Sequence, residues 1–130
     1  MVQRIWILVA LAGLLFSMNG CVSGQVRLSS SDSGKTIDIK TGGSIVVELN
    51  GNPTTGYTWE AKDLDTRMLK QEGETEFKSS NPGLIGAGGT LTLTFKTLMA
   101  GKTTLELVYH RPWEKNVEPQ STYSVSVNIK

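Results

Sequence analysis

The sequence predicts an all-β protein, a two-sheet β-sandwich of about seven strands. Apolar residues alternate with polar ones in six separate runs, and this period of two places one set of side chains inward in a half-buried strand. Turn-forming residues at Gly42-Gly43, Ala100-Gly101 and Pro119 separate the runs. No run has a sustained helical period, and only a turn is expected around Asp63 to Met68. The alternating apolar positions are Ile37 and Ile39; Ile45, Val47 and Leu49; Tyr57, Trp59 and Ala61; Leu91, Leu93 and Phe95; Leu105, Leu107 and Tyr109; Tyr123, Val125, Val127 and Ile129.

Residues 1–21 have the pattern of a signal peptide. Arg4 is the only charged residue among the first twenty, Ile5 to Phe16 is apolar, and small or polar residues follow. The apolar run has about a dozen residues, which suits a signal-peptide core and is short of the ~20 residues that span a bilayer. We therefore predict that the chain is exported, to the periplasm or the outer membrane, or is secreted.

Cys21 is the only cysteine, so an internal disulfide is excluded and the thiol needs another explanation. Its place after the apolar run resembles that of the acceptor cysteine of bacterial lipoproteins. Gly20 fits the usual lipoprotein pattern, whereas Met18 and Asn19 depart from it. Two interpretations stay open: Cys21 is lipidated and attaches the chain to a membrane, or a conventional signal peptide is cleaved nearby. In the first case, Val22 favours the outer membrane by resemblance to sorting rules.

Residues 22–35 are rich in Ser and Gly and are predicted to form a spacer, in which Val26 to Leu28 could supply a short edge strand. The alternating pattern then extends from residue 36 to residue 130. A chain of 130 residues is expected to form one domain and can bury a core without disulfides.

Charge and composition exclude several classes of function. The formal net charge is +1, and without Arg4 the remaining 13 − 1 = 12 basic residues balance 12 acidic ones. A neutral domain lacks the basic patch expected for nucleic-acid binding. His110 is the only histidine, so neither a His/Cys metal cluster nor a nucleophile–base pair with Cys21 is expected. We predict a monomer that is not an enzyme and has no metal or cofactor.

The connection Asn52-Pro53-Thr54-Thr55-Gly56-Tyr57 is unusual for a simple hairpin. Asn50-Gly51 alone would suggest a two-residue turn, but Pro53 cannot donate to a continuing ladder. Pro53 fixes φ, and Gly56 permits positive φ. We expect a longer, shaped loop that presents two short hydroxyl side chains, and such loops on rigid scaffolds often carry function.

Two further connections stand out. Residues 78–89 lack strand character, and Leu84-Ile85-Gly86-Ala87-Gly88-Gly89 places two large aliphatic side chains beside four small residues. These aliphatics either fold back on the core or meet a partner. Arg111-Pro112-Trp113 leaves the strand that ends near Tyr109. Trp113 could plug the core or serve as an interface residue, because Trp and Arg are enriched in binding hot spots.

These three motifs, in this order, resemble the chagasin-like inhibitors of papain-type cysteine peptidases, over roughly Val26 to Lys130. The resemblance implies an immunoglobulin-like sandwich whose three loops lie at one end and enter the peptidase cleft together. The residues that it implies contact the peptidase are Asn52, Pro53, Thr54, Thr55, Gly56, Tyr57, Leu84, Ile85, Gly86, Ala87, Gly88, Gly89, Arg111, Pro112 and Trp113.

The resemblance also implies a role for each loop. Thr54 and Thr55 would reach the catalytic Cys–His pair. The loop from Leu84 to Gly89 would run along the non-primed side of the cleft. Trp113 would stack on aromatic surface on the primed side, with Arg111 able to pair with a carboxylate.

The predicted function is therefore reversible, tight-binding inhibition of papain-like cysteine peptidases. The alternative is an exported immunoglobulin-like binding or adhesion module without inhibitory activity, because a sandwich fold alone does not fix a function.

Overall fold

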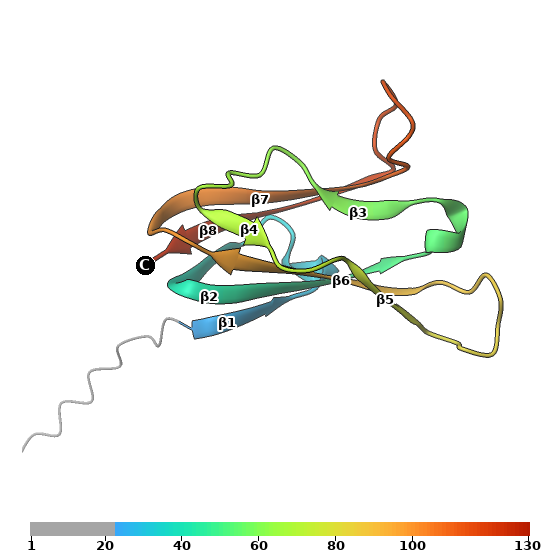
Figure 1. Ribbon diagram of the computed structural model, residues 1–130, viewed down its shortest axis with the longest axis horizontal. Coiled ribbons are helices and arrows are strands. Elements are labelled where there is room, and N and C mark those ends of the chain that lie inside the picture. Colours follow the sequence, from blue (N-terminus) through green and yellow to red (C-terminus); the bar gives the residue numbers. More distant parts are fainter. Residues whose placement is uncertain (1–22) are drawn as a thin grey trace, which may run out of the picture.

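The computed structural model describes residues 23–130 as eight strands in two layers (Figure 1). It confirms the predicted all-β sandwich, with one strand more than expected. The predicted signal peptide, including Cys21, lies outside the described residues. The strands are β1 (Ser23–Leu28), β2 (Thr36–Gly51), β3 (Thr58–Ala61), β4 (Leu69–Gln71), β5 (Glu76–Ser79), β6 (Gly89–Thr97), β7 (Gly101–His110) and β8 (Ser121–Ile129).

One layer contains β1, the second half of β2, and β6, with β4 and β5 one after the other along the free edge of β6. The other layer contains β3, β7, β8 and the first half of β2. Most neighbouring strands are antiparallel, but β2 runs parallel to β1 and to β8. Within residues 23–130, no helix is long and apolar enough to cross a bilayer.

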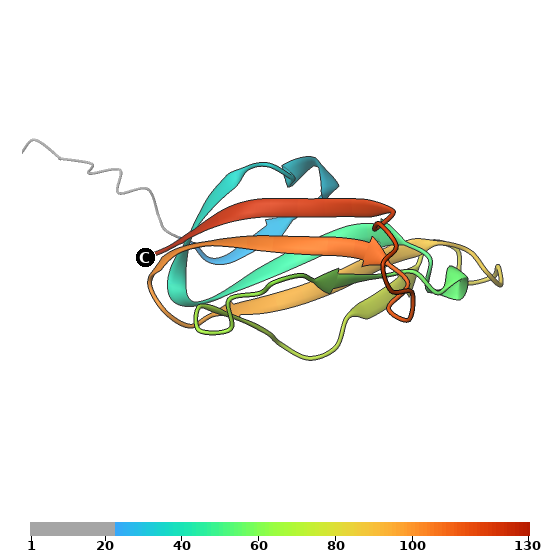
Figure 2. The ribbon, with the colours of Figure 1, turned by 90° about the horizontal axis from the view of Figure 1, so that it is seen from above.

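The bend in β2 joins the two layers. Figure 2 shows β2 running to one end of the molecule and turning back there. The bend lies at the predicted turn, where Gly42 has φ of 80° and a Cβ on Gly43 would lie 2.8 Å from the Gly24 carbonyl oxygen. The fully buried Thr97 hydroxyl accepts a hydrogen bond from Gly43 N (2.9 Å) and donates one to the Lys40 carbonyl (2.6 Å). Thr97 therefore satisfies backbone groups that the bend removes from the ladder.

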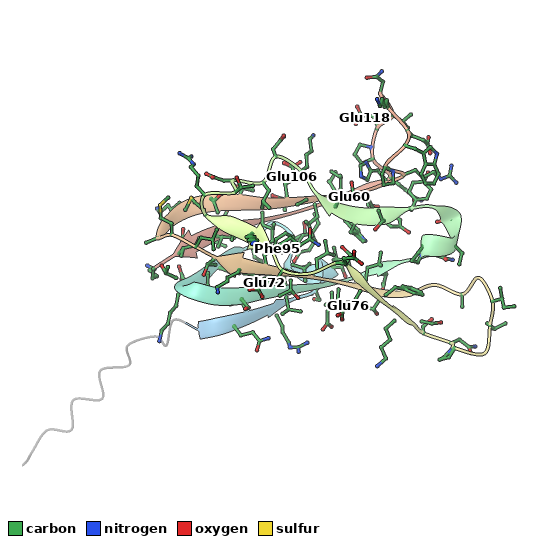
Figure 3. All side chains as sticks on the ribbon, viewed as in Figure 1. Glu60, Glu72, Glu76, Phe95, Glu106 and Glu118 are labelled. Atoms are coloured by element: carbon green, nitrogen blue, oxygen red, sulfur yellow. The ribbon has the colours of Figure 1, made fainter. Side chains whose placement is uncertain are left out.

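The core lies between the two layers, as the alternating pattern predicts. Phe95 is fully buried there (Figure 3). Burial of these side chains is the main source of stability, at about 25 cal/mol per Å² of apolar surface. The buried cluster comprises Leu28, Ile39, Ile45, Val47, Leu49, Trp59, Met68, Leu69, Leu91, Leu93, Phe95, Leu105, Leu107, Tyr123, Val125, Val127 and Ile129.

The segment predicted as a spacer, residues 22–35, is instead part of the folded domain from residue 23 onward. The strand β1 includes the expected edge segment and buries Leu28, which is 5% exposed. After β1 the chain forms a short 3₁₀ turn, and the Tyr123 hydroxyl donates a hydrogen bond to the Ser29 carbonyl (3.0 Å). Ser and Gly content suggested flexibility here, but one buried leucine and backbone pairing outweigh that composition.

The loop predicted over residues 78–89 is shorter in the structure. Lys78 pairs with Thr90, and Ser79 pairs with Gly89, so the connection between β5 and β6 is residues 80–88. The end of the short edge strand β5 was not predicted as a strand, because the side chains of this stretch are polar. The turn expected at Asp63 to Met68 is present, with Met68 N donating to the Asp65 carbonyl (3.0 Å).

Tyr123 should make the fold sensitive to alkali. Burial, and secondarily the nearby charge of Asp32, raises the pKa of Tyr123 to about 12 from its usual 10. The folded state thus favours the neutral phenol, so this contribution is present below pH 10 and is lost as pH rises through the folded pKa. We expect about 2 kcal/mol of unfolding free energy to disappear between pH 10 and pH 12.

Urea unfolding at several pH values measures this loss. In Tyr123→Phe, the slope between pH 10 and pH 12 should flatten, while stability at pH 7 falls by about 1 kcal/mol for the lost hydrogen bond to Ser29. Equal slopes in the two proteins would contradict the assignment to Tyr123.

Candidate functional site

The three motifs singled out from the sequence lie at one end of the sandwich (Figure 1). They occupy the connection after β2, the connection after β5 (residues 80–88) and the connection after β7 (residues 111–120). The second half of β2 and the strand β5 run in the same direction, because each is antiparallel to β6. The first half of β2 runs the opposite way and is parallel to β8. Since β7 is antiparallel to β8, it has the same direction as β5 and the second half of β2. Loops that follow strands of one direction leave the sandwich at the same end.

The first loop is built on a 3₁₀ turn, Pro53–Thr55. Asn52 caps this turn, since its side-chain Oδ1 accepts a hydrogen bond from Thr54 N (3.1 Å). Gly56 ends the turn with φ of 85°, a left-handed conformation that suits glycine. Pro53, Asn52 and Gly56 therefore specify the shaped loop that the sequence predicts.

The hydroxyl groups of Thr54 and Thr55 both donate hydrogen bonds within the loop. Thr54 donates to Asn52 Oδ1, and Thr55 donates to the Asn52 carbonyl (2.6 Å). Both threonines are exposed. With the hydroxyl protons used internally, the groups that remain for a partner are oxygen lone pairs and methyl groups. The loop end is thus an acceptor surface.

The second loop is tied to the first through Asn52. The Asn52 side-chain Nδ2 donates to the Gly86 carbonyl (2.9 Å), and Ser80 Oγ donates to the Gly88 carbonyl (2.7 Å) at the base of the same loop. Leu84 is 61% exposed and Ile85 is fully exposed. Of the two alternatives for these aliphatics, the structure therefore has them facing solvent rather than folding back on the core.

The third loop is tied to the first through Arg111. Its Nε donates to the Thr55 carbonyl (3.0 Å), and its guanidinium lies 4.6 Å from the centre of the Tyr57 ring. Its Nη1 donates to Glu114 (3.2 Å). The resemblance implies that Arg111 can pair with a carboxylate of the peptidase; within the domain Arg111 joins two loops and pairs with Glu114, three residues later on its own loop.

Trp113 is a surface residue and does not plug the core, since it is 66% exposed. Its ring lies directly against Gly56, where an added Cβ would overlap the indole. The indole is therefore presented beside the first loop, with most of its surface open to solvent.

Sequence reasoning missed the support beneath these loops. Tyr109, which alternation assigned simply to the core side of a strand, accepts a hydrogen bond from Asn52 N on its hydroxyl (2.9 Å). Its ring lies between Tyr57 and Trp59, at centroid distances of 5.3 and 5.1 Å. No local sequence signal distinguishes this role from ordinary burial. The ion pair between Arg111 and Glu114 could have been predicted from the sequence, because the two residues lie three positions apart.

Two pairs of ionisable side chains lie beside the loops, Arg111 with Glu114 and His110 with Glu60. His110 Nε2 lies 2.8 Å from Glu60, at the start of the third loop. Figure 3 shows Glu60 on β3 and Glu118 on the neighbouring loop. Among residues 23–130, no group of three His, Cys, Asp or Glu side chains is placed to hold a metal ion.

Comparisons with known proteins all indicate the same protein family. The model of the chagasin family of peptidase inhibitors matches residues 38–127. Amoebiasin-2 of Entamoeba histolytica is 33% identical over 104 residues, covering 79% of this chain and 84% of that protein. Chagasin of Trypanosoma cruzi is 29% identical over 91 residues, covering 67% of this chain and 82% of chagasin.

A solved structure supports the same relationship. The crystal structure of a cysteine protease inhibitor from Entamoeba histolytica superposes with a TM-score of 0.71 at 30% identity. The match covers 82% of this chain and 96% of that one.

Gly56→Ala should separate the first and third loops. The substitution forces a side chain into a left-handed conformation and into the Trp113 ring, so we expect a loss of about 1–3 kcal/mol and a changed Trp113 fluorescence. Urea unfolding and emission spectra measure the two effects.

Gly86→Ala is the matched control, because Gly86 also has positive φ (81°) but no heavy atom lies within 4 Å of an added Cβ. It should lose only the conformational part, about 1 kcal/mol, with unchanged emission. Identical behaviour of the two variants would show that contact with Trp113 does not matter.

Proposed function

The chain belongs to the chagasin family of peptidase inhibitors, and we propose that it inhibits papain-like cysteine peptidases by placing its three loops in the active-site cleft. The family consists of inhibitors rather than enzymes, which favours inhibition over the alternative of a non-inhibitory adhesion module. The observation that carries the proposal is the joining of the three loops into one surface by Asn52 and Arg111.

The first loop suits the centre of such a cleft. A papain-like peptidase holds a thiolate beside a protonated histidine, which is a hydrogen-bond donor. Thr54 and Thr55 offer hydroxyl lone pairs, since their protons are engaged within the loop. Small acceptor side chains on a stiff turn can approach the histidine without a bulky obstruction.

The same loop should resist cleavage because three of its carbonyl groups are already engaged. The Asn52 carbonyl accepts from Thr55, the Pro53 carbonyl accepts from Gly56 N (2.9 Å), and the Thr55 carbonyl accepts from Arg111. A peptidase needs a substrate carbonyl turned toward its oxyanion donors and aligned with the nucleophile. The 3₁₀ turn holds these carbonyls in other directions, so proximity to the thiolate leads to no reaction.

The second and third loops supply apolar contact on either side. Leu84 and Ile85 extend from a glycine-containing loop whose backbone a partner can approach closely, as in the addition of an extended strand. Trp113 presents an indole at the other side of the first loop. A large aromatic side chain that is ordered before binding loses little entropy on association.

Export and membrane attachment through Cys21 form the second part of the proposal. The sequence of residues 1–21 supports export, to the periplasm or the outer membrane, with secretion as the alternative if the signal peptide is cleaved without lipidation. Mass analysis of the N-terminal peptide from a membrane fraction tests it, because a lipid on Cys21 adds the mass of its acyl chains.

Trp113→Ala should weaken inhibition of papain without weakening the fold. We expect a loss of about 2–4 kcal/mol in binding, or roughly 30- to 1,000-fold in the inhibition constant, because the exposed indole acts as an anchor. Inhibition assays with the chain of residues 22–130, combined with thermal unfolding, measure both effects.

Val117→Ala is the matched control, since Val117 lies in the same loop and is 58% exposed but is outside the motif. It should change inhibition by less than about threefold. Failure of the unmodified domain to inhibit several papain-like enzymes would refute the proposed function itself.

The first loop should remain intact in the complex. After long incubation with papain in excess, we expect intact-mass measurement to find no cleavage between residues 52 and 57, whereas a denatured sample is cut. Rapid cleavage there would mean that the carbonyls of the loop can reach attack geometry.

A further inference from the structure

A second surface lies at the end of the sandwich opposite the three loops, and we call it the distal end. It consists of the β2 bend (residues 40–43), the turn between β6 and β7 (residues 98–101) and the start of β1. Hydrogen bonds join the β2 bend to the chain on either side of it, from Gly43 N to Thr97 at the end of β6 and from Thr41 N to the Lys130 carbonyl after β8 (3.0 Å). The nine residues of β6 separate this end from the three loops, a distance of about 26 Å at the rise of a β-strand.

The turn at the distal end exposes two large apolar side chains. Leu98 is 41% exposed and Met99 is 48% exposed. Turns are normally made of small and polar residues, so adjacent Leu and Met at a turn are unusual. The other exposed large apolar side chains of the described residues lie on the loops at the opposite end or, for Phe77, on β5.

Exposed lysines lie in the segments next to this apolar turn. Lys40 lies in the β2 bend, Lys102 directly follows the turn, and Lys130 follows the end of β8. Of the carboxylates in the adjoining segments, Asp65 pairs with Arg67, and Asp38 accepts a hydrogen bond from the neutral amide of Asn128. The three lysines outnumber Asp38 and Asp63, the carboxylates of these segments that are not in an ion pair among the described residues. Lysines around an apolar tip match the interface of an anionic bilayer, where apolar atoms enter the headgroup region and ammonium groups meet phosphates.

The chain also enters the domain at this end. The strand β1 begins at Ser23, which pairs with Ile39, and the Gly24 carbonyl lies beside Gly43. Ser23 follows Cys21 by two residues, which span at most about 7 Å. A lipid on Cys21 would therefore hold the distal end, and not the loops, close to the membrane.

We propose that the distal end rests on the surface of an anionic phospholipid bilayer, so that the three loops point away from the membrane toward soluble peptidases. The lipid-facing residues are Lys40, Leu98, Met99, Lys102 and Lys130. This inference rests on the proposed attachment through Cys21.

Spin labels at the two ends test this orientation in the full chain, recovered in membranes from a bacterium that processes lipoproteins. Met99→Cys and Ile85→Cys are labelled separately with a nitroxide, and collision with a water-soluble nickel complex is measured. We expect the label at 99 to be at least fivefold less accessible than the label at 85. Equal accessibility of the two labels would overturn the proposal.

Charge variants in the same labelled chain provide the control. Lys40→Glu together with Lys102→Glu should raise nickel accessibility at position 99 severalfold, because like charges repel the distal end from the anionic surface. Lys78→Glu together with Lys115→Glu, which lie toward the loops, should leave it unchanged. Equal effects of the two pairs would count against a specific contact.

The lipid analysis separates this inference from the attachment that it assumes. A lipid on Cys21 with equal accessibility at both labels refutes the orientation and leaves the attachment intact. A soluble chain without lipid on Cys21 refutes both. Neither result bears on inhibition of papain, which is measured separately.

Discussion

The organisation of the site depends on Asn52, whose side chain and backbone connect the first loop to the second loop and to the sheet. Nδ2 donates to the second loop at Gly86, Oδ1 accepts from Thr54, and the carbonyl accepts from Thr55. The Asn52 N–H donates to Tyr109 in the sheet below. Only an amide side chain of this length can donate across to one loop and accept within its own. Aspartate could not donate to Gly86, serine could cap the turn but is too short to reach Gly86, and alanine would lose both connections.

Arg111 completes the arrangement from the other side, so the loops are joined before a partner arrives. Its planar guanidinium binds the Thr55 carbonyl, Glu114 and the face of Tyr57 at once. A lysine could not meet all three in one geometry. Ordering three flexible loops on binding would cost free energy for each immobilised segment. Because the intramolecular contacts order the loops during folding, this entropy is not lost again on binding. The free energy gained by burying the exposed Trp113, Leu84 and Ile85 side chains then favours association.

Local patterns were enough to predict the fold class and the positions of the three loops, but not the contacts that join them. Alternation located the core because each strand has one buried face. Pro53 and Gly56 predicted a shaped loop because each restricts or permits particular backbone angles. The bond from Asn52 to Gly86 crosses 34 residues to a backbone carbonyl, which every residue has, so no side-chain pattern marks it. The bond from Arg111 to the Thr55 carbonyl was missed for the same reason.

Strand direction explains why one short domain can have two unlike ends. Loops after the second half of β2, after β5 and after β7 must leave together, and the β2 bend and the β6–β7 turn must lie at the other end. A chain that starts β1 at the second end is held there by backbone pairing with β2. The direction of the loops relative to residue 23 is thus set by hydrogen-bonded strands rather than by a flexible tether. Any attachment before residue 23 would therefore leave the three loops at the far end of the domain.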